Sequence, residues 1–301
     1  MYIDLSNQFR VIRPQGLGFP YCYSLLAHGR TAVLIDPGAG PLHLEKAGAL
    51  DADLVLLSHF HFDHINGFPF FHHAQFMVGE EERETYEDSV VHHHHHGYER
   101  WAELLGSERP VYEAPAIAGS SIRPGFHPLL IAGTFHDGMS IDLGGLTLVA
   151  LAAPGHTVGH YVFYFPEAQV LYAADIDLSK FGPWYANTFS SVSDFLRSLN
   201  MVHDLPFTTF VSSHRRPLNR AQALAGIDQY RDILLERTER IYQLLERPQT
   251  LSELSANCVT VVQHDSDYHI FWEMVMMEKH LDYLQEQGRI EQEGKIYRQK
   301  R

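Results

Sequence analysis

The chain has 301 residues, of which 45% are hydrophobic and 20% are charged. These proportions exclude a largely disordered chain, and the length suits one large domain or a main domain with a small appendage. The formal net charge of −14 disfavours broad binding to nucleic-acid phosphates, because like charges repel.

The cysteines and the N-terminus suggest a cytoplasmic protein. Cys22 and Cys258 are far apart in the sequence, so no disulfide framework is expected. The first residues show no basic stretch followed by an apolar run, which a signal peptide would have. No segment reaches the roughly 18 uninterrupted apolar residues that a membrane span needs, so we expect no membrane partner.

Short strands are predicted in the first part of the chain. Apolar runs at 21–26 and 31–35 are separated by a His-Gly-Arg turn signal. A short helix can form over 42–50, and the run at 53–57 predicts a buried strand. The following stretch at about 80–128 is rich in Glu, His, Gly and Pro, which favours an insertion or lid over a site.

The middle of the chain predicts a second set of strands. They are expected at 140–143, 147–151, 161–165, 170–173 and 208–211. The Gly-Gly pair at 144–145 suits a hairpin turn between the first two. Apolar residues recur at helical spacing over 193–205, which predicts an amphipathic helix.

The last 80 or so residues change character. The stretch 221–245 is strongly helical, Thr250 to Glu253 has the form of a capping box, and a further helix is expected over 270–287. A hairpin can follow at 290–297. This order predicts a small winged-helix-like module at 221–301, appended to a catalytic domain at 1–220.

A dense string of possible metal ligands follows the strand predicted at 53–57. It consists of His59, His61, Asp63 and His64. Side chains two residues apart in an extended loop can project to the same side, and neutral imidazole and carboxylate are the usual ligands of zinc, iron and manganese. A run of solvated surface histidines is the alternative. It is disfavoured because further ligand types follow other predicted strands, namely His156, Asp175 and His214.

These blocks resemble the metallo-β-lactamase superfamily. The chain shows His-x-His-x-Asp-His at 59–64, Pro-Gly-His-Thr-x-Gly-His at 154–160, an Asp after an apolar strand and a late His. Asp36 resembles the early Asp of that family, which is a structural support. The resemblance covers roughly residues 1–220. It implies a four-layer αββα sandwich of the α/β class, with the metal site at one edge of the paired sheets.

The resemblance also implies which residues bind metal. The first ion would take His59, His61 and His156, the second would take Asp63, His64 and His214, and Asp175 would bridge them. Zinc is the favoured ion, although iron and manganese accept the same ligands. Two such ions about 3.5–4 Å apart activate a water and polarise the oxygen on which charge develops. Asp63 could also hold that water and accept its proton.

Several neighbouring residues are candidates for supporting roles. Thr157 and His160 could orient His156, although His160 is equally well explained as a core histidine. Arg215 and Arg216 could bind an anionic group of the substrate or only form surface ion pairs. Trp184 and Tyr185 could line the substrate pocket or pack beneath the C-terminal helices. The run at 92–96 of five histidines is expected to be mainly a solvated loop, with a lid histidine that reaches the site as the alternative.

The leading hypothesis is hydrolysis of an ester or thioester of a small molecule. The blocks at 59–67 and 155–160 resemble the glyoxalase II-like branch, whereas the C-terminus is more similar to the lactamase-β-2-like hydrolases than to a glutathione-binding segment. A metal-dependent nuclease or phosphodiesterase is an alternative that the acidic charge disfavours. The second alternative is a persulfide dioxygenase-like enzyme with one iron ion. It is disfavoured because the ligands for a second ion are all present. The third alternative is a docking role of the C-terminal module, for which homodimerisation is the favoured use.

Overall fold

The computed structural model describes residues 1–112, 114, 116–261 and 264–300. Its first sheet has seven strands that follow one another in chain order. They are β1 (Tyr2–Asp4), β2 (Phe9–Ile12), β3 (Ser24–His28), β4 (Ala32–Ile35), β5 (Leu54–Leu57), β6 (Gln75–Gly79) and β7 (Ile131–Phe135). The pairs from β4 to β7 are parallel, so the carboxyl ends of β4, β5 and β6 meet at one edge.

The second sheet has six strands in the order β13-β12-β11-β10-β9-β8. They are β8 (Ser140–Asp142), β9 (Thr147–Ala152), β10 (Tyr161–Phe165), β11 (Val170–Tyr172), β12 (Thr209–Val211) and β13 (Leu218–Asn219). Gly144 and Gly145, both with positive φ, make the β8–β9 turn as predicted. β11 and β12 pair in parallel, so both chain segments leave the sheet on the same side.

The two sheets pack face to face over an apolar core. Phe9 of the first sheet meets Phe165 of the second edge-to-face at 4.9 Å between ring centroids, and Phe135 meets Phe163 at 5.4 Å. These rings belong to one cluster of buried side chains that draws on both sheets. Inward-facing apolar residues on both sheets therefore make the middle of the molecule a β-sandwich.

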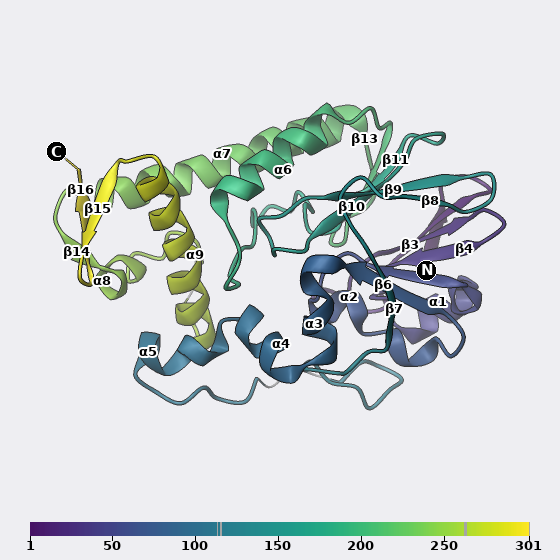
Figure 1. The fold of residues 1–301 in the computed structure, drawn as a ribbon, viewed down its shortest axis with the longest axis horizontal. Helices are drawn as coiled ribbons and strands as arrows, with labels where there is room; N and C mark the ends of the chain where they lie inside the picture. The colour runs from purple at the N-terminus through teal and green to yellow at the C-terminus, as the bar shows by residue number, and fades with distance from the viewer. Residues whose placement is uncertain (113, 115, 262–263, 301) are drawn as a thin grey trace.

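Helices cover the outer face of each sheet, which confirms the expected αββα arrangement (Figure 1). Beside the first sheet lie α1 (Pro41–Lys46), η1 (Ala49–Asp51), α2 (Phe62–Ile65), η2 (Phe68–Phe70), η3 (Glu80–Glu82) and α3 (Arg83–Glu87). Beside the second lie α6 (Val192–Asp204), the predicted amphipathic helix, and α7 (Arg220–Leu244). None of the helices in the described part of the chain is long and apolar enough to cross a membrane.

The predicted insertion at 80–128 is largely helical in its first part. After α3 come α4 (Ser89–His95), η4 (Tyr98–Arg100) and α5 (Trp101–Leu105). The expectation of a solvated histidine loop is wrong, because four of the five histidines lie in α4 and the side chains of His92 and His95 are buried. Positions three apart share one face of a helix, so the run presents a packed face and an exposed one.

The C-terminal region begins with α7 and has a small sheet of its own. It contains β14 (Gln249–Thr250), α8 (Leu251–Ser255), α9 (Asp267–Glu286), β15 (Ile290–Glu293) and β16 (Ile296–Gln299). The capping box at Thr250 and Glu253 and the terminal hairpin are confirmed. The division at residue 220 and the winged-helix-like character of 221–301 stay predictions. Trp101 stacks on Phe271 at 4.8 Å, so α9 also packs against the insertion.

Candidate metal centre

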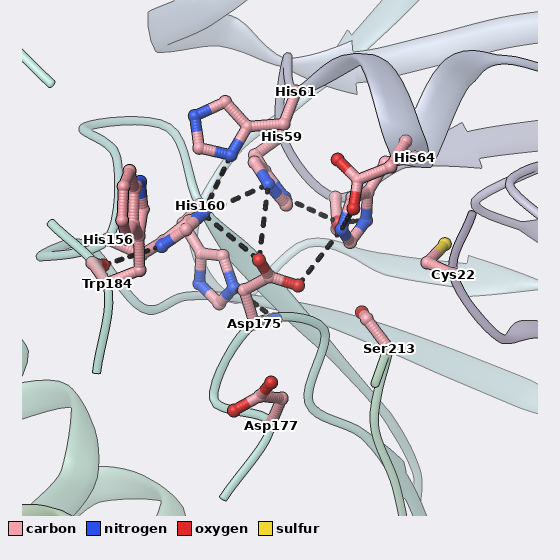
Figure 2. A network of polar contacts seen from close by, with 12 residues as sticks. Cys22, His59, His61, His64, His156, His160, Asp175, Asp177, Trp184 and Ser213 are labelled. Carbon is pink, nitrogen blue, oxygen red and sulfur yellow. Dashed lines mark hydrogen bonds and ion pairs between the residues drawn. The ribbon is translucent and has the colours of Figure 1, made fainter. Parts of the chain in front are cut away.

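The predicted ligands lie where strands of both sheets end. His59, His61, Asp63 and His64 follow β5 of the first sheet, three of them in or beside α2. The other three follow β9, β11 and β12 of the second sheet, at His156, Asp175 and His214. Figure 2 shows imidazoles from both sheets converging around Asp175. The fold thus gathers residues from four strand ends at the shared edge of the sandwich.

The first donor group consists of His59, His61, His156 and Asp175. Nε2 of His156 lies 3.1 Å from Nε2 of His59 and 3.0 Å from Nδ1 of His61. The same nitrogen is 3.3 Å from Oδ2 of Asp175. Donors at the corners of a tetrahedron around zinc are about 3.3 Å apart. Three clustered imidazole nitrogens and one carboxylate oxygen therefore fit a four-coordinate ion.

The second donor group consists of Asp63, His64 and His214. Oδ2 of Asp63 lies 3.4 Å from Nε2 of His214 and 3.9 Å from Nε2 of His64. The other oxygen of Asp175, Oδ1, is 2.9 Å from Nε2 of His64 and 3.3 Å from Nε2 of His214. Asp175 thus directs one oxygen to each group, which is the arrangement that a bridging carboxylate requires.

Two buried atoms, one from the second group and one from Asp175, support a bound cation. Nε2 of His64 and Oδ1 of Asp175 are shielded from solvent, yet neither makes a hydrogen bond to any described residue. Their 2.9 Å contact lacks hydrogen-bond angles, as expected for two atoms aimed at a third. Leaving buried polar atoms unsatisfied is costly, so the donor set fits a metal ion that both atoms would bind.

The two groups differ in their preferred protonation. Burial lowers the pKa of His59 and of His156 well below the usual value for histidine, which favours the neutral imidazole that metals bind. Burial also opposes charge on His214, but the carboxylates of Asp175 and Asp63 raise its pKa to about 9. Metal binding would therefore displace protons from the second group, so metal affinity should fall at low pH.

Asp36, proposed from the resemblance as a structural support, contacts His64 of the second group. Its buried carboxylate lies 2.7 Å from Nδ1 of His64 and accepts from the hydroxyls of Ser58 at 2.6 Å and Tyr172 at 2.9 Å. These bonds fix the His64 ring so that Nε2 faces the centre. Asp36 adopts a φ of 53°, an uncommon backbone conformation for a residue other than glycine.

The residues that orient His156 differ from those proposed. Nδ1 of His156 lies 2.8 Å from the carbonyl oxygen of Trp184, and within the described chain no hydrogen bond joins His156 to Thr157. His160 instead accepts a hydrogen bond from the backbone N–H of Asp175 at 3.1 Å. Asn187, which sequence reasoning missed, contacts Nε2 of His61 at 3.2 Å and the His156 carbonyl at 3.3 Å.

Glu82 is a second residue that sequence reasoning missed. Its carboxylate is 1% exposed and accepts hydrogen bonds from the backbone N–H of Phe60 at 3.0 Å and of Gly159 at 2.9 Å. Burial raises its pKa to about 7. Phe60 lies between His59 and His61, and Gly159 lies in the loop of His156. Glu82 therefore links the two loops that supply the three histidines of the first donor group.

A cavity of about 630 Å³ opens onto the centre. His61, Asp63, His156, Asp175 and His214 line it, together with residues of the 80–128 segment such as His92, His96 and Arg109. Of the proposed substrate contacts, Trp184 lines the cavity, whereas Tyr185, Arg215 and Arg216 are not among its lining residues. The Tyr185 hydroxyl lies 2.7 Å from Nε2 of the buried His280, and Arg215 donates to the carbonyl of Leu178.

Comparisons with known proteins identify a matching family. The model of the metallo-beta-lactamase superfamily matches residues 16–214. A hydroxyacylglutathione hydrolase from Ruegeria pomeroyi is 27% identical over 229 residues, which cover 73% of each chain. A beta-lactamase-like protein 2 homolog from Caenorhabditis elegans is 21% identical and covers 76% of this chain and 67% of that protein.

Two solved structures resemble the chain over 99% of its length. A metallo-beta-lactamase family protein from Thermus thermophilus superimposes with a TM-score of 0.75 at 25% identity and covers 99% of this chain and 100% of that one. A beta-lactamase domain protein from Burkholderia ambifaria has a TM-score of 0.67 at 16% identity, over 99% and 93% of the two chains. At 16% identity, the similarity to the Burkholderia ambifaria protein supports the fold alone.

Proposed function

Since this chain belongs to the metallo-beta-lactamase superfamily and is a hydrolase of that superfamily, we propose that it hydrolyses an ester or thioester of a small molecule. The proposed centre holds two divalent ions, with zinc favoured. The observation that carries the proposal is the position of Asp175, whose two carboxylate oxygens face two separate donor groups.

The ions, when bound, would supply an activated water and polarise the substrate carbonyl. The chain's own residues have the remaining tasks. Asp63 is 7% exposed, lines the cavity and directs Oδ2 toward His214, so it is placed to accept a proton from a water in the cavity. The loops of His61 and His156 are held by Asn187 and Glu82, so the donors need little rearrangement.

The acyl substrate is supported by the relatives and by the cavity. Several curated relatives are named hydroxyacylglutathione hydrolase, and the thioester is the bond that such a hydrolase would cleave. Arg109 is the one arginine or lysine among the described lining residues. A polyanionic nucleic acid would find few positive partners there, which supports a small acyl compound over a phosphodiester.

Metal analysis joined to a substrate screen tests the proposal. We expect two divalent ions per chain, and about one in either His61→Ala or His214→Ala, because each variant removes a donor from one group. Thiol release from thioesters should fall about 100-fold or more in His61→Ala. His72→Ala is the matched control, because His72 is exposed.

Three results would contradict the proposal. One iron per chain would indicate a mononuclear oxidative enzyme instead of a binuclear hydrolase. Faster cleavage of phosphodiesters than of thioesters and lactones would indicate a nuclease. Full thioesterase activity in His61→Ala would exclude catalysis at this centre.

A further inference from the structure

The cavity beside the metal centre has an aromatic wall built from distant parts of the chain. Trp184 meets Trp272 of α9 edge-to-face at 5.0 Å between centroids, and Phe19 meets Tyr112 at 6.0 Å. Tyr98 lines the same space. Rings supplied by separate segments form a surface that suits an apolar or aromatic group, since such surfaces gain free energy when they are withdrawn from water.

The guanidinium group of Arg109 lies among these aromatic side chains. The Arg109 carbon Cζ lies 4.3 Å from the centroid of the Tyr98 ring, and Nη1 donates to the Tyr268 hydroxyl at 2.9 Å. The Tyr268 hydroxyl in turn donates to the carbonyl of Pro110 at 2.8 Å. These contacts hold the guanidinium plane in place at the edge of the cavity.

The positive charge of Arg109 has no described counterion. Over residues 1–112, 114, 116–261 and 264–300, no carboxylate lies within ion-pair distance of it, and its bond to Tyr268 uses only one of five N–H donors. A guanidinium fork matches the oxygens of a carboxylate or sulfonate. The acidic side chains that line the cavity, Asp63, Asp175 and Asp177, would repel a second anion in a ligand.

Arg109 is within reach of the metal centre. Tyr98 stacks on His96 at 4.8 Å and 12°, and His96 stacks on His61 at 5.8 Å and 11°. Three stacking contacts separate the guanidinium from a proposed metal ligand, so the distance is roughly 15 Å or less. A cavity of about 630 Å³ is of the size that accepts one compact organic ligand, which could touch both ends.

We infer that this cavity selects esters or thioesters that carry a bulky apolar or aromatic segment and a single anionic group, and that Arg109 binds that anion. The inference rests on the proposed hydrolase function of the same cavity. The aromatic wall binds the apolar segment, and the acyl carbon lies beside the proposed metal ligands. Arg109 sets the distance between the scissile bond and the anion.

Calorimetric binding of 3-phenylpropane-1-sulfonate and 3-phenylpropan-1-ol to the metal-loaded protein tests the anion site without turnover. Sulfonates are weak metal ligands, so metal binding should contribute little to their affinity. We expect the sulfonate to bind about 10- to 100-fold more tightly than the alcohol, as a charge-assisted pair would give. Arg109→Gln should remove this preference while keeping affinity for the alcohol, and Arg109→Lys should keep part of it. Arg247→Gln, at an exposed position, should match the native protein.

Two binding results would overturn the assignment. A preference for the sulfonate that persists in Arg109→Gln would place the anion elsewhere. Equal loss of both ligands in Arg109→Gln would show that Arg109 supports the cavity and does not bind the anion.

A matched pair of thioesters separates this inference from the proposed function. The 3-phenylpropanoyl thioesters of 3-mercaptopropionate and of ethanethiol differ in one anionic group. Arg109→Gln should raise KM about 10-fold or more for the anionic thioester only, with kcat little changed. Equal KM values for both thioesters in the native enzyme would overturn the inference and leave the hydrolase function intact. Sulfonate binding with no hydrolysis of either thioester would support the anion site and contradict the hydrolase function.

Discussion

Two buried carboxylates outside the proposed ligand set hold the residues around the metal centre. Asp36 fixes the ring of His64 through Nδ1, and Glu82 accepts hydrogen bonds from the two loops that carry the histidines of the first donor group. Each side chain satisfies donors that would otherwise be buried without a partner, which is costly. Their effect on metal binding is therefore indirect: they hold the ligands in position.

Glu82→Gln should weaken metal binding without removing a ligand. The amide of glutamine has one acceptor oxygen, so its NH₂ group would face the N–H of either Phe60 or Gly159. We expect a 10- to 100-fold loss of metal affinity, the usual effect of disturbing groups behind metal ligands. Competition with a chromophoric chelator measures it. Glu84→Gln, a neighbouring exposed residue of α3, should keep native affinity, and native affinity in Glu82→Gln would refute the role assigned to Glu82.

At the scale of elements, one buried histidine joins α9 to α7. His280 lies 2.7 Å from Oγ1 of Thr238 and 2.7 Å from the hydroxyl of Tyr185. Thr238 donates its own proton to the Leu234 carbonyl, so it accepts from Nδ1–H of His280, which leaves Nε2 to accept from Tyr185. Burial, reinforced by nearby Arg237, lowers the pKa of His280 to about 3.

This histidine should make the α7–α9 contact sensitive to acid. Between pH 6.5 and about 3 the unfolded chain binds a proton at His280 that the folded chain does not. The contribution to stability is therefore complete above pH 6.5 and is lost progressively as the pH falls. Between pH 7 and pH 5 the contribution of His280 to the free energy of unfolding falls by about 2 kcal/mol.

Urea unfolding of the native protein and of His280→Gln at pH 7, 6 and 5 measures this contribution. The variant should be less stable at pH 7, yet its free energy of unfolding should fall less steeply with pH. His136→Gln, at an exposed position, should keep the native slope. Parallel pH profiles for the native protein and His280→Gln would contradict the assigned acid sensitivity.

At the scale of the molecule, the sandwich has a core that is independent of the metal centre. The cluster between the sheets is formed by apolar side chains of both, such as Phe9, Phe135 and Phe163. The proposed ligands lie at one edge and come from both sheets. Bound ions would therefore cross-link two sheets that already pack against each other, and would add stability without creating the fold.

Chelation should consequently lower thermal stability while preserving the fold. With free ion at about 1,000 times the Kd, one site contributes about 4 kcal/mol, which for a chain of 301 residues corresponds to a fall in Tm of about 6 °C. Scanning calorimetry with and without EDTA measures this, and far-UV circular dichroism at 25 °C should be unchanged. Loss of the folded signal on chelation would show that the ions are required for folding.

Local patterns were sufficient to predict many of the strands and helices and to single out the candidate ligands, whereas the αββα arrangement and the division of the ligands between two ions were implied by the family resemblance. The strand before His59 is a short apolar run, the capping box at Thr250 lies within four residues, and α6 has helical apolar spacing. Such features depend on interactions between near neighbours in the chain. The seven ligand candidates could be named because each follows a predicted strand, and strand ends meet at a sheet edge.

Tertiary packing decided the rest. Glu82 reaches Gly159 across 77 positions, and Arg109 reaches Tyr268 across 159, distances at which sequence spacing carries no signal. The run at 92–96 was misjudged because polar composition suggests solvation, whereas the neighbours of a helix determine which of its faces is buried. The substrate cavity could not be predicted from the sequence for the same reason, since its walls come from separate segments that only the folded chain brings together.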